Sequence, residues 1–405
     1  MTGNSKTCDS RLIGGIGLLA AAMAGLYFIS MLVFTKFRLS APLDDAFIYF
    51  QYARKLSMGR FFEYVAGEGY SSGATSFLYA FILAPFAFLL KGSALIPVTY
   101  VIGAACLFIT GYYIYGTVFK IAQSRVYAIF GALLFMTNGN FLWGYFSGME
   151  ICLFGSLISA AIYYMAEPAD ARKLFAALCL LSCVRPEGFF IAGIFCAVSV
   201  FSALLSGRKW LKNIRPAYLA ALLPGAAYFI INKAMTGDFM PNTMRAKSDF
   251  SQYIFHITEV LKNGFSKYFI FMSDIMNGGQ QHWFPAYALV FFITGILPGV
   301  AAEASEKKPA VYTTAFLWFF LGVLSTVFSS FFYVHNFRYP MPFAVIFAVF
   351  TAIGVKNAAE RISPKGASGA KPAAYAIMSV FLLFNFFTVV ANTVNFGANC
   401  RDIYS

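Results

Sequence analysis

Two adjacent carboxylates, Asp44 and Asp45, are the first residues whose type and spacing could do chemistry. They precede an amphipathic helical segment in which Tyr49, Tyr52 and Ala53 occupy neighbouring positions. A carboxylate near a low-dielectric boundary has a raised pKa and can accept a proton from a hydroxyl group. Aspartate is also a good helix N-cap, and the spacing alone does not choose between a cap and a base.

Two further acids stand next to apolar segments. Glu150 follows Ser147 at the start of one of them, where a negative charge also favours a helix N-terminus. Arg185 and Glu187 belong to the sequence Arg-Pro-Glu-Gly, which interrupts another apolar stretch. An ionisable pair at membrane depth usually marks function, and an internal ion pair that fixes a turn is the alternative. Both roles can hold together.

Cations flank these acids along the chain. Arg245 and Lys247 follow Asn242 in one polar segment, and Arg338 follows His335 in another. Arg and Lys suit the recognition of phosphate, so cations beside carboxylates indicate a ligand that carries a phosphate group. A lone cation of this kind would instead contact a lipid headgroup.

A Gly- and Ser-rich stretch at residues 67–76 contains Tyr70 and Ser72. Glycine and serine let the backbone approach a ligand closely, which favours a substrate-binding loop. An ordinary flexible linker has the same composition, so the composition alone leaves both interpretations open.

The composition requires that these residues sit on a membrane protein. Of the 405 residues, 60% are hydrophobic and 12% are charged, whereas a soluble domain carries about 25% charged residues. The net charge of +13 comes largely from Lys and Arg in short loops, which set orientation and contact anionic lipid, so nucleic-acid binding is not indicated.

The apolar pattern predicts an all-α polytopic protein with about eleven crossings, since each crossing needs about 20 mostly apolar residues. The first is a retained signal anchor, because its apolar run is longer than the core of a signal peptide. The predicted crossings are 13–35, 94–119, 125–142, 149–166, 173–184, 188–206, 217–235, 284–302, 310–332, 338–355 and 373–394.

Basic loops at 208–215, 307–308 and 356–372 predict the cytoplasmic side, and Lys120 and Arg125 agree. With that orientation, the apolar run 73–91 cannot cross, so we expect a re-entrant or juxtamembrane helix there. The alternative places Lys120 and Arg125 outside. Residues 1–405 then form one membrane domain with two outer loops, 36–93 and 236–283, and an interfacial helix near 250–272 lies in the second.

Taken in order, these motifs resemble a known family. They are Asp-Asp-Ala-Phe-Ile at 44–48, Ser-Gly-Met-Glu at 147–150, Arg-Pro-Glu-Gly at 185–188, Pro-Asn-Thr at 241–243 and Phe-Arg-Tyr at 337–339. The chain resembles the GT-C membrane glycosyltransferases, in particular bacterial members related to the terminal arabinofuranosyltransferases of mycobacterial cell walls. The resemblance spans roughly residues 36–345.

The resemblance implies an inverting transfer of a hexosyl or pentosyl group from a polyprenyl-phosphate-linked donor. The acceptor would be a cell-envelope glycan, lipid or protein on the outer face of the prokaryotic cytoplasmic membrane. Asp44 would be the general base with Asp45 as its organiser, and Arg338 with Arg245 or Lys247 would hold the donor phosphate. The implied substrate-binding residues are Glu150, Tyr70, Ser72, Asn242, Arg185, Glu187 and His335.

A divalent metal is left open by the resemblance, with Asp44 and Glu150 as candidate ligands. The sequence continues only briefly beyond residue 394, without the large outer domain of the nearest relatives, which favours a small or lipid acceptor. A transporter or flippase of lipid-linked sugars is the alternative function. It predicts inverted repeats with matching broken helices, and the sequence suggests only the break at Arg-Pro-Glu-Gly.

Overall fold

The structure is a computed structural model in which the regular elements of the described residues are helices. It describes residues 4–166, 171–206, 217–242, 257–274, 287–306, 311–327, 337–362 and 370–404. The helices there are α1 (Asn4–Phe34), α2 (Asp45–Ser57), α3 (Phe77–Leu89), α4 (Ile96–Ala122), α5 (Arg125–Met136), α6 (Gly139–Tyr145), α7 (Ile151–Met165), α8 (Ala171–Val184), α9 (Pro186–Ser206), α10 (Ala217–Ala220), α11 (Leu223–Thr236), α14 (Ile257–Asp274), α15 (Tyr287–Glu306), α16 (Val311–Val327), α17 (Ala344–Ile362) and α18 (Ala370–Tyr404).

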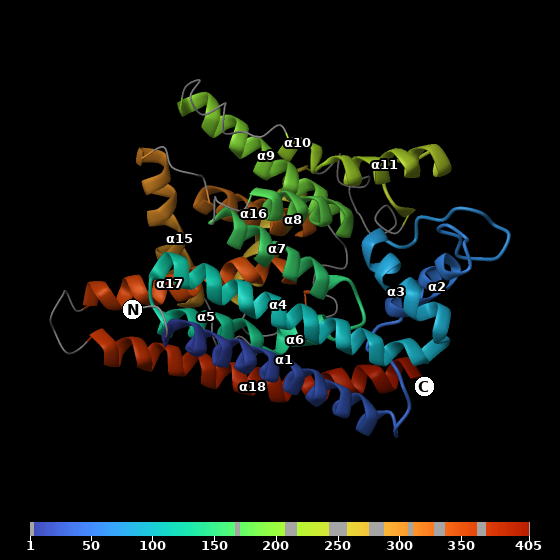
Figure 1. The fold of residues 1–405 in the computed structure, drawn as a ribbon, viewed down its shortest axis with the longest axis horizontal. Helices are drawn as coiled ribbons and strands as arrows, with labels where there is room; N and C mark the ends of the chain where they lie inside the picture. The colour runs from blue at the N-terminus through green and yellow to red at the C-terminus, as the bar shows by residue number, and fades with distance from the viewer. Residues whose placement is uncertain are drawn as a thin grey trace.

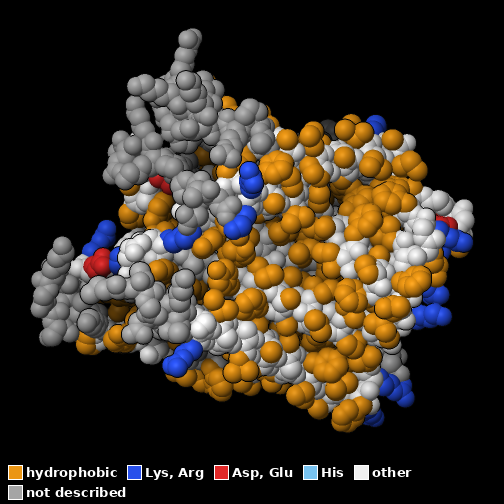
Figure 2. Space-filling model, viewed as in Figure 1, with side chains coloured by type: hydrophobic (Ala, Val, Ile, Leu, Met, Phe, Trp, Pro, Cys, Tyr) orange, Lys and Arg blue, Asp and Glu red, His pale blue; other side chains and the backbone are white. Residues whose placement is uncertain are grey.

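The helices form a bundle, and the face of it that Figure 2 shows is mostly apolar. Figure 2 shows hydrophobic side chains across the middle of the molecule, with Lys and Arg gathered towards the edges of the view. A surface of this kind is stable in lipid and not in water, because water does not solvate so large an apolar area. The structure therefore confirms a multi-pass all-α membrane protein.

Five helices in the described part are long and apolar enough to cross a bilayer, and a bent pair could supply a sixth. Several shorter apolar helices accompany them, so helix length does not confirm the predicted eleven crossings. The five are Ser10–Phe34, Gly92–Ala122, Tyr218–Thr236, Met341–Ile362 and Pro372–Ile403.

The apolar segment predicted as a crossing at 125–142 consists of two helices, α5 and α6, which meet at an angle of 62°. Asn138 causes the break. Its side-chain oxygen accepts hydrogen bonds from the backbone N–H groups of Asn140 and Phe141, as an N-cap does. Its amide also donates to Oδ1 of Asn385 in α18 at 3.0 Å. These partners satisfy the buried Asn138 side chain at the start of α6.

The predicted turn at Arg-Pro-Glu-Gly is present between α8 and α9, with Arg185 alone between the two helices. Pro186 begins α9, where its missing N–H costs nothing. Gly188 is required by close packing, since a Cβ atom there would lie 1.9 Å from the backbone oxygen of Leu181. The sequence thus produces a tight corner that brings Arg185 to the helix ends.

Residues 36–93 fold against one end of the bundle, where α2 and α3 lie side by side (Figure 1). Helix α3 has 13 residues, which is about 20 Å and less than the ~30 Å of a bilayer core. The juxtamembrane position of α3 stays a prediction. In the second loop, the helix expected near 250–272 is present as α14.

The two longest helices, α1 and α18, run along each other on one side of the bundle (Figure 1). Ser30 of α1 donates to the backbone oxygen of Thr393 in α18 at 2.6 Å. Beyond the end of α1, buried Ser40 donates to the backbone oxygen of Cys400 at 2.8 Å. Helix α18, with 35 residues, therefore holds the segment that leads into Asp44.

Candidate active site

The two adjacent acids take different positions at the start of α2. Asp44 is exposed and is the N-cap residue, and its Oδ1 accepts a hydrogen bond from the Asp45 backbone N–H at 2.8 Å. Asp45 is the first residue of the helix, and its side chain turns towards the bundle and keeps 21% of its exposure. One acid thus caps the helix and reaches solvent, while the other faces protein.

Asp45 pairs with Arg338, which lies 293 positions later in the sequence. Nη2 of Arg338 donates to Oδ2 of Asp45 at 2.6 Å and to the Tyr339 hydroxyl at 3.1 Å. Arg338 is 3% exposed, and its Nε and Nη1 atoms have no hydrogen-bond partner within the described ranges. Buried guanidinium donors without partners are costly, so they favour an anionic ligand that is absent here.

A second ion cluster forms where α7 begins and α8 turns into α9. Arg185 donates through Nε and Nη2 to the two carboxylate oxygens of Glu187, at 3.1 and 2.9 Å. Its Nη1 donates to Oε1 of Glu150, so every nitrogen of this guanidinium has an acidic partner. Glu150 and Arg185 are buried, and Oε2 of Glu150 has no hydrogen-bond partner in the described part of the chain.

Tyr339 lies between the two clusters. Its ring centroid is 5.0 Å from the guanidinium carbon of Arg338 and 5.4 Å from that of Arg185. An aromatic ring attracts both cations and separates them from each other. The only signal for this role in the sequence is the place of Tyr339 beside Arg338 in the Phe-Arg-Tyr motif, which does not indicate the contact with Arg185.

Tyr49 links the start of α2 to the second cluster. Its hydroxyl lies 3.0 Å from the Thr75 hydroxyl, and its ring packs edge-on against Tyr79. Burial, followed by the negative charge of Glu150, raises the pKa of the Tyr49 phenol well above its usual value of 10. Tyr49 therefore stays a neutral hydroxyl beside Glu150. Its position on the amphipathic face was the only sequence signal for this role.

Gly148 allows α2 to approach the loop before α7. Its φ of +79° lies in the left-handed region, and a Cβ atom there would come 3.1 Å from Cβ of Ala46. Tyr79 of α3 also donates to the Gly148 backbone oxygen at 3.1 Å. This glycine therefore sets the distance between the helix that carries Asp45 and the helix that follows Glu150.

Three predicted substrate-binding residues gather in a different place, where the segment between α2 and α3 meets the end of α11. The Asn242 backbone N–H donates to the buried Ser72 hydroxyl at 3.1 Å. Tyr70 donates to Oδ1 of Asn232 at 3.4 Å, and burial raises the Tyr70 pKa to about 12. These contacts join the segment between α2 and α3 to α11 and to the residues that follow it, and none of them connects directly to Arg338 or Arg185.

The remaining predicted residues, Arg245, Lys247 and His335, lie outside the described residues. Within the described ranges, no three His, Cys, Asp or Glu side chains gather closely enough to hold a metal ion. Glu150 is engaged by Arg185, and Asp44 caps α2, so the donor set around them does not fit a divalent metal.

No family model matches this chain, and no curated protein matches its sequence. Its fold does resemble solved structures. Archaeal oligosaccharyltransferase AglB from Archaeoglobus fulgidus, in complex with an inhibitory peptide and a dolichol-phosphate, has a TM-score of 0.59 at 14% identity, over 95% of this chain and 56% of that chain. The same organism's oligosaccharyltransferase tethered with an acceptor peptide gives 0.60 at 13%, over 93% and 55%.

ArnT from Cupriavidus metallidurans, bound to undecaprenyl phosphate, has a TM-score of 0.51 at 11% identity, over 96% of this chain and 77% of that chain. This chain spans just over half the length of the oligosaccharyltransferases. At these identities the likeness concerns the fold, and it does not distinguish the arabinofuranosyltransferase group. The chain therefore has a GT-C-like fold, similar to that of these solved structures.

Proposed function

We propose that this chain is an inverting glycosyltransferase that uses a polyprenyl-phosphate-linked sugar. The acceptor is a glycan, lipid or protein on the outer face of a prokaryotic cytoplasmic membrane. The observation that carries the proposal is the buried Arg338, which is held by Asp45 and whose Nε and Nη1 have no hydrogen-bond partner among the described residues. It occurs in a fold whose solved examples include one bound to undecaprenyl phosphate.

The proposed reaction divides the acidic pair into two roles. The donor phosphate binds at Arg338, which stabilises the negative charge of the leaving polyprenyl phosphate. Exposed Asp44 accepts the proton of the acceptor hydroxyl while the new glycosidic bond forms and the bond from the anomeric carbon to the phosphate oxygen breaks. Asp45 orients Arg338 through their ion pair. Arg245 and Lys247 are proposed as further phosphate contacts.

The second cluster, Glu150 with Arg185 and Glu187, is proposed to shape the substrate side of this centre. Tyr339 connects this cluster to Arg338, because its ring contacts both guanidinium groups. Tyr70, Ser72, Asn242 and His335 stay proposed contacts to the sugar or acceptor. Eleven crossings, with 36–93 and 236–283 outside, would place all of these groups on the donor's face of the membrane.

A transporter or flippase of lipid-linked sugars stays the alternative. The bend between α5 and α6 is a second broken helix, which the sequence did not suggest. Two broken helices are a transporter feature, so the preference for an enzyme rests on the fold similarity and on Arg338. The two functions differ in product, because only the enzyme forms a new glycosidic bond.

The test measures sugar transfer by the purified protein from a panel of synthetic polyprenyl-phosphate sugars. We expect Arg338→Ala, Asp44→Asn and Asp45→Asn each to lower transfer about 100-fold or more. Arg401→Ala is the matched control, because the one ion pair of this exposed arginine among the described residues is with its neighbour Asp402. Full activity in all three site variants would exclude the mechanism. Movement of intact donor across a vesicle membrane without transfer would favour the flippase.

A further inference from the structure

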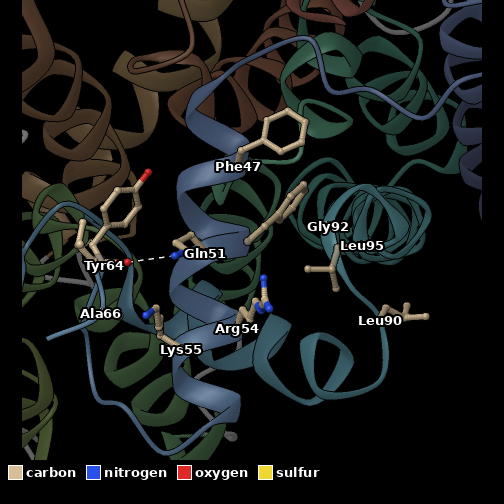
Figure 3. Close-up of a pocket in the computed structure, with 11 residues that line it drawn as sticks. Phe47, Gln51, Arg54, Lys55, Tyr64, Ala66, Leu90, Gly92 and Leu95 are labelled. Atoms are coloured by element: carbon tan, nitrogen blue, oxygen red, sulfur yellow. Dashed lines mark hydrogen bonds between the residues drawn. The ribbon is translucent and has the colours of Figure 1, made fainter.

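A groove lies on the face of α2 opposite the Asp45 site. Its volume is about 540 Å³, which is within the range of ligand pockets. Successive residues of a helix turn by about 100°, so Asp45, Tyr49 and Tyr52 share one face of α2 while Phe47, Gln51 and Arg54 share the other. Figure 3 shows this second set lining the groove together with Leu90 and Leu95.

One wall of the groove is formed by Tyr64, Val65 and Ala66, and a hydrogen bond from α2 holds it in place. The Gln51 side-chain amide donates to the backbone oxygen of Tyr64 at 3.0 Å, which is drawn as a dashed line in Figure 3. The opposite wall consists of Leu90, Gly92 and Leu95, where the chain leaves α3 and enters α4. The cavity is therefore bounded by three segments of the same outer loop region.

The lining carries two positive charges and no carboxylate. Arg54 is exposed, and its guanidinium forms no ion pair with any residue that the structure describes. Lys55 is mostly buried, with Glu63 at 4.0 Å as its acidic neighbour. An unpaired arginine at the edge of an apolar groove is arranged to meet an anion such as phosphate.

The apolar part of the groove continues onto the surface of α3. Phe88 and Leu89 are 73% and 77% exposed, and they directly precede Leu90 in the groove wall. Exposed apolar side chains beside Arg54 and Lys91 have the composition of a membrane interface, where cations meet headgroups and apolar residues meet acyl chains. A ligand that satisfies both parts must be an amphiphile.

We propose that this groove binds an anionic membrane lipid. Its phosphate group contacts Arg54, and its chain lies along Phe47, Leu95 and the exposed face of α3. The site is separate from the phosphate position proposed at Arg338, because the two arginines are reached from opposite faces of α2. The proposal does not depend on glycosyl transfer.

The test uses the purified full chain in detergent and native mass spectrometry with phosphatidylglycerol and phosphatidylcholine of equal chain length. We expect preferential retention of phosphatidylglycerol, and Arg54→Gln should weaken it about fivefold without changing phosphatidylcholine binding. Ala66→Trp should lower the binding of both lipids, because Ala66 is an exposed lining residue and the indole would fill the cavity. Arg401→Gln should bind like the native protein.

Two results would overturn the proposal. Unchanged phosphatidylglycerol binding in both Arg54→Gln and Ala66→Trp would place the lipid elsewhere. Displacement of phosphatidylglycerol by inorganic phosphate at millimolar concentration would show that the site takes a free anion and not a lipid. Asp44→Asn should keep full lipid binding, so failure of the transfer assay and failure of this proposal are distinguishable.

Discussion

The Arg185 and Arg338 clusters contain the same kinds of side chain but differ in how completely their hydrogen bonds are satisfied. Arg185 uses all three of its nitrogens on Glu150 and Glu187. Arg338 uses only Nη2 within the described residues. Both guanidinium groups are buried, so burial of a charge does not by itself mark a binding site. The feature that distinguishes Arg338 as a candidate binding site is its two nitrogen atoms without a hydrogen-bond partner among the described residues.

Removing Arg185, whose hydrogen bonds are all satisfied, should have the largest effect on stability. Arg185→Met leaves Glu150 and Glu187 without their cation in a buried site, which should lower the free energy of unfolding by about 3–5 kcal/mol. Chemical denaturation in detergent measures this. Adding Glu150→Gln and Glu187→Gln to the same chain should recover much of the loss. If Arg185→Met alone were as stable as the native protein, the cluster would have no structural role.

Gly188→Ala tests whether the tight turn between α8 and α9 positions the Arg185 cluster. The added Cβ would meet the Leu181 backbone oxygen, so the α8–α9 turn must open, at a cost of about 1–3 kcal/mol. Gly193→Ala is the control in the same helix, because a Cβ there meets nothing within 4 Å. Thermal melting of the two variants gives the comparison, and equal melting temperatures would contradict the packing argument.

Tyr339→Phe tests the connection between the clusters. It removes the hydroxyl that accepts from Arg338 and keeps the ring between the two arginines, so we expect a stability loss of about 1 kcal/mol. Tyr339→Leu, which also removes the ring, should cost more and should lower transfer further. If the phenylalanine variant lost as much transfer as the leucine variant, the hydroxyl and not the ring would carry the connection.

Glu63, in the segment between α2 and α3, provides a counterpart away from the two arginine clusters and the smallest effect. The Gly67 backbone N–H, followed by the nearby Arg60 and Lys55, lowers its pKa below the usual value. Its ionised form therefore stabilises the fold above the ordinary glutamate pKa of about 4.3, and this contribution disappears as the pH falls through the lower native value. The melting-temperature difference between native protein and Glu63→Gln should be constant near neutral pH and should shrink below about pH 4. A difference independent of pH would contradict this.

The sequence predicted the helices and the corner at Arg185 because apolar length, proline and glycine act locally. It did not predict the break at Asn138, since that break depends on Asn385 in a distant helix. The ion pair of Asp45 and Arg338 joins segments far apart in the chain, so only the roles of the two residues could be proposed from resemblance. The position of Tyr339 between two cations likewise depends on tertiary packing.

The length of α18 has a consequence for the membrane in which the protein works. Its 35 residues extend about 52 Å, well beyond a bilayer core of ~30 Å, so the helix can adapt to different thicknesses by changing its tilt. The hydrogen bond between Ser40 and Cys400 would transmit that tilt to the segment before Asp44. We therefore expect activity to depend on acyl-chain length in reconstituted vesicles, and Ser40→Ala to weaken this dependence. Equal dependence in both proteins would show that bilayer thickness acts through another contact.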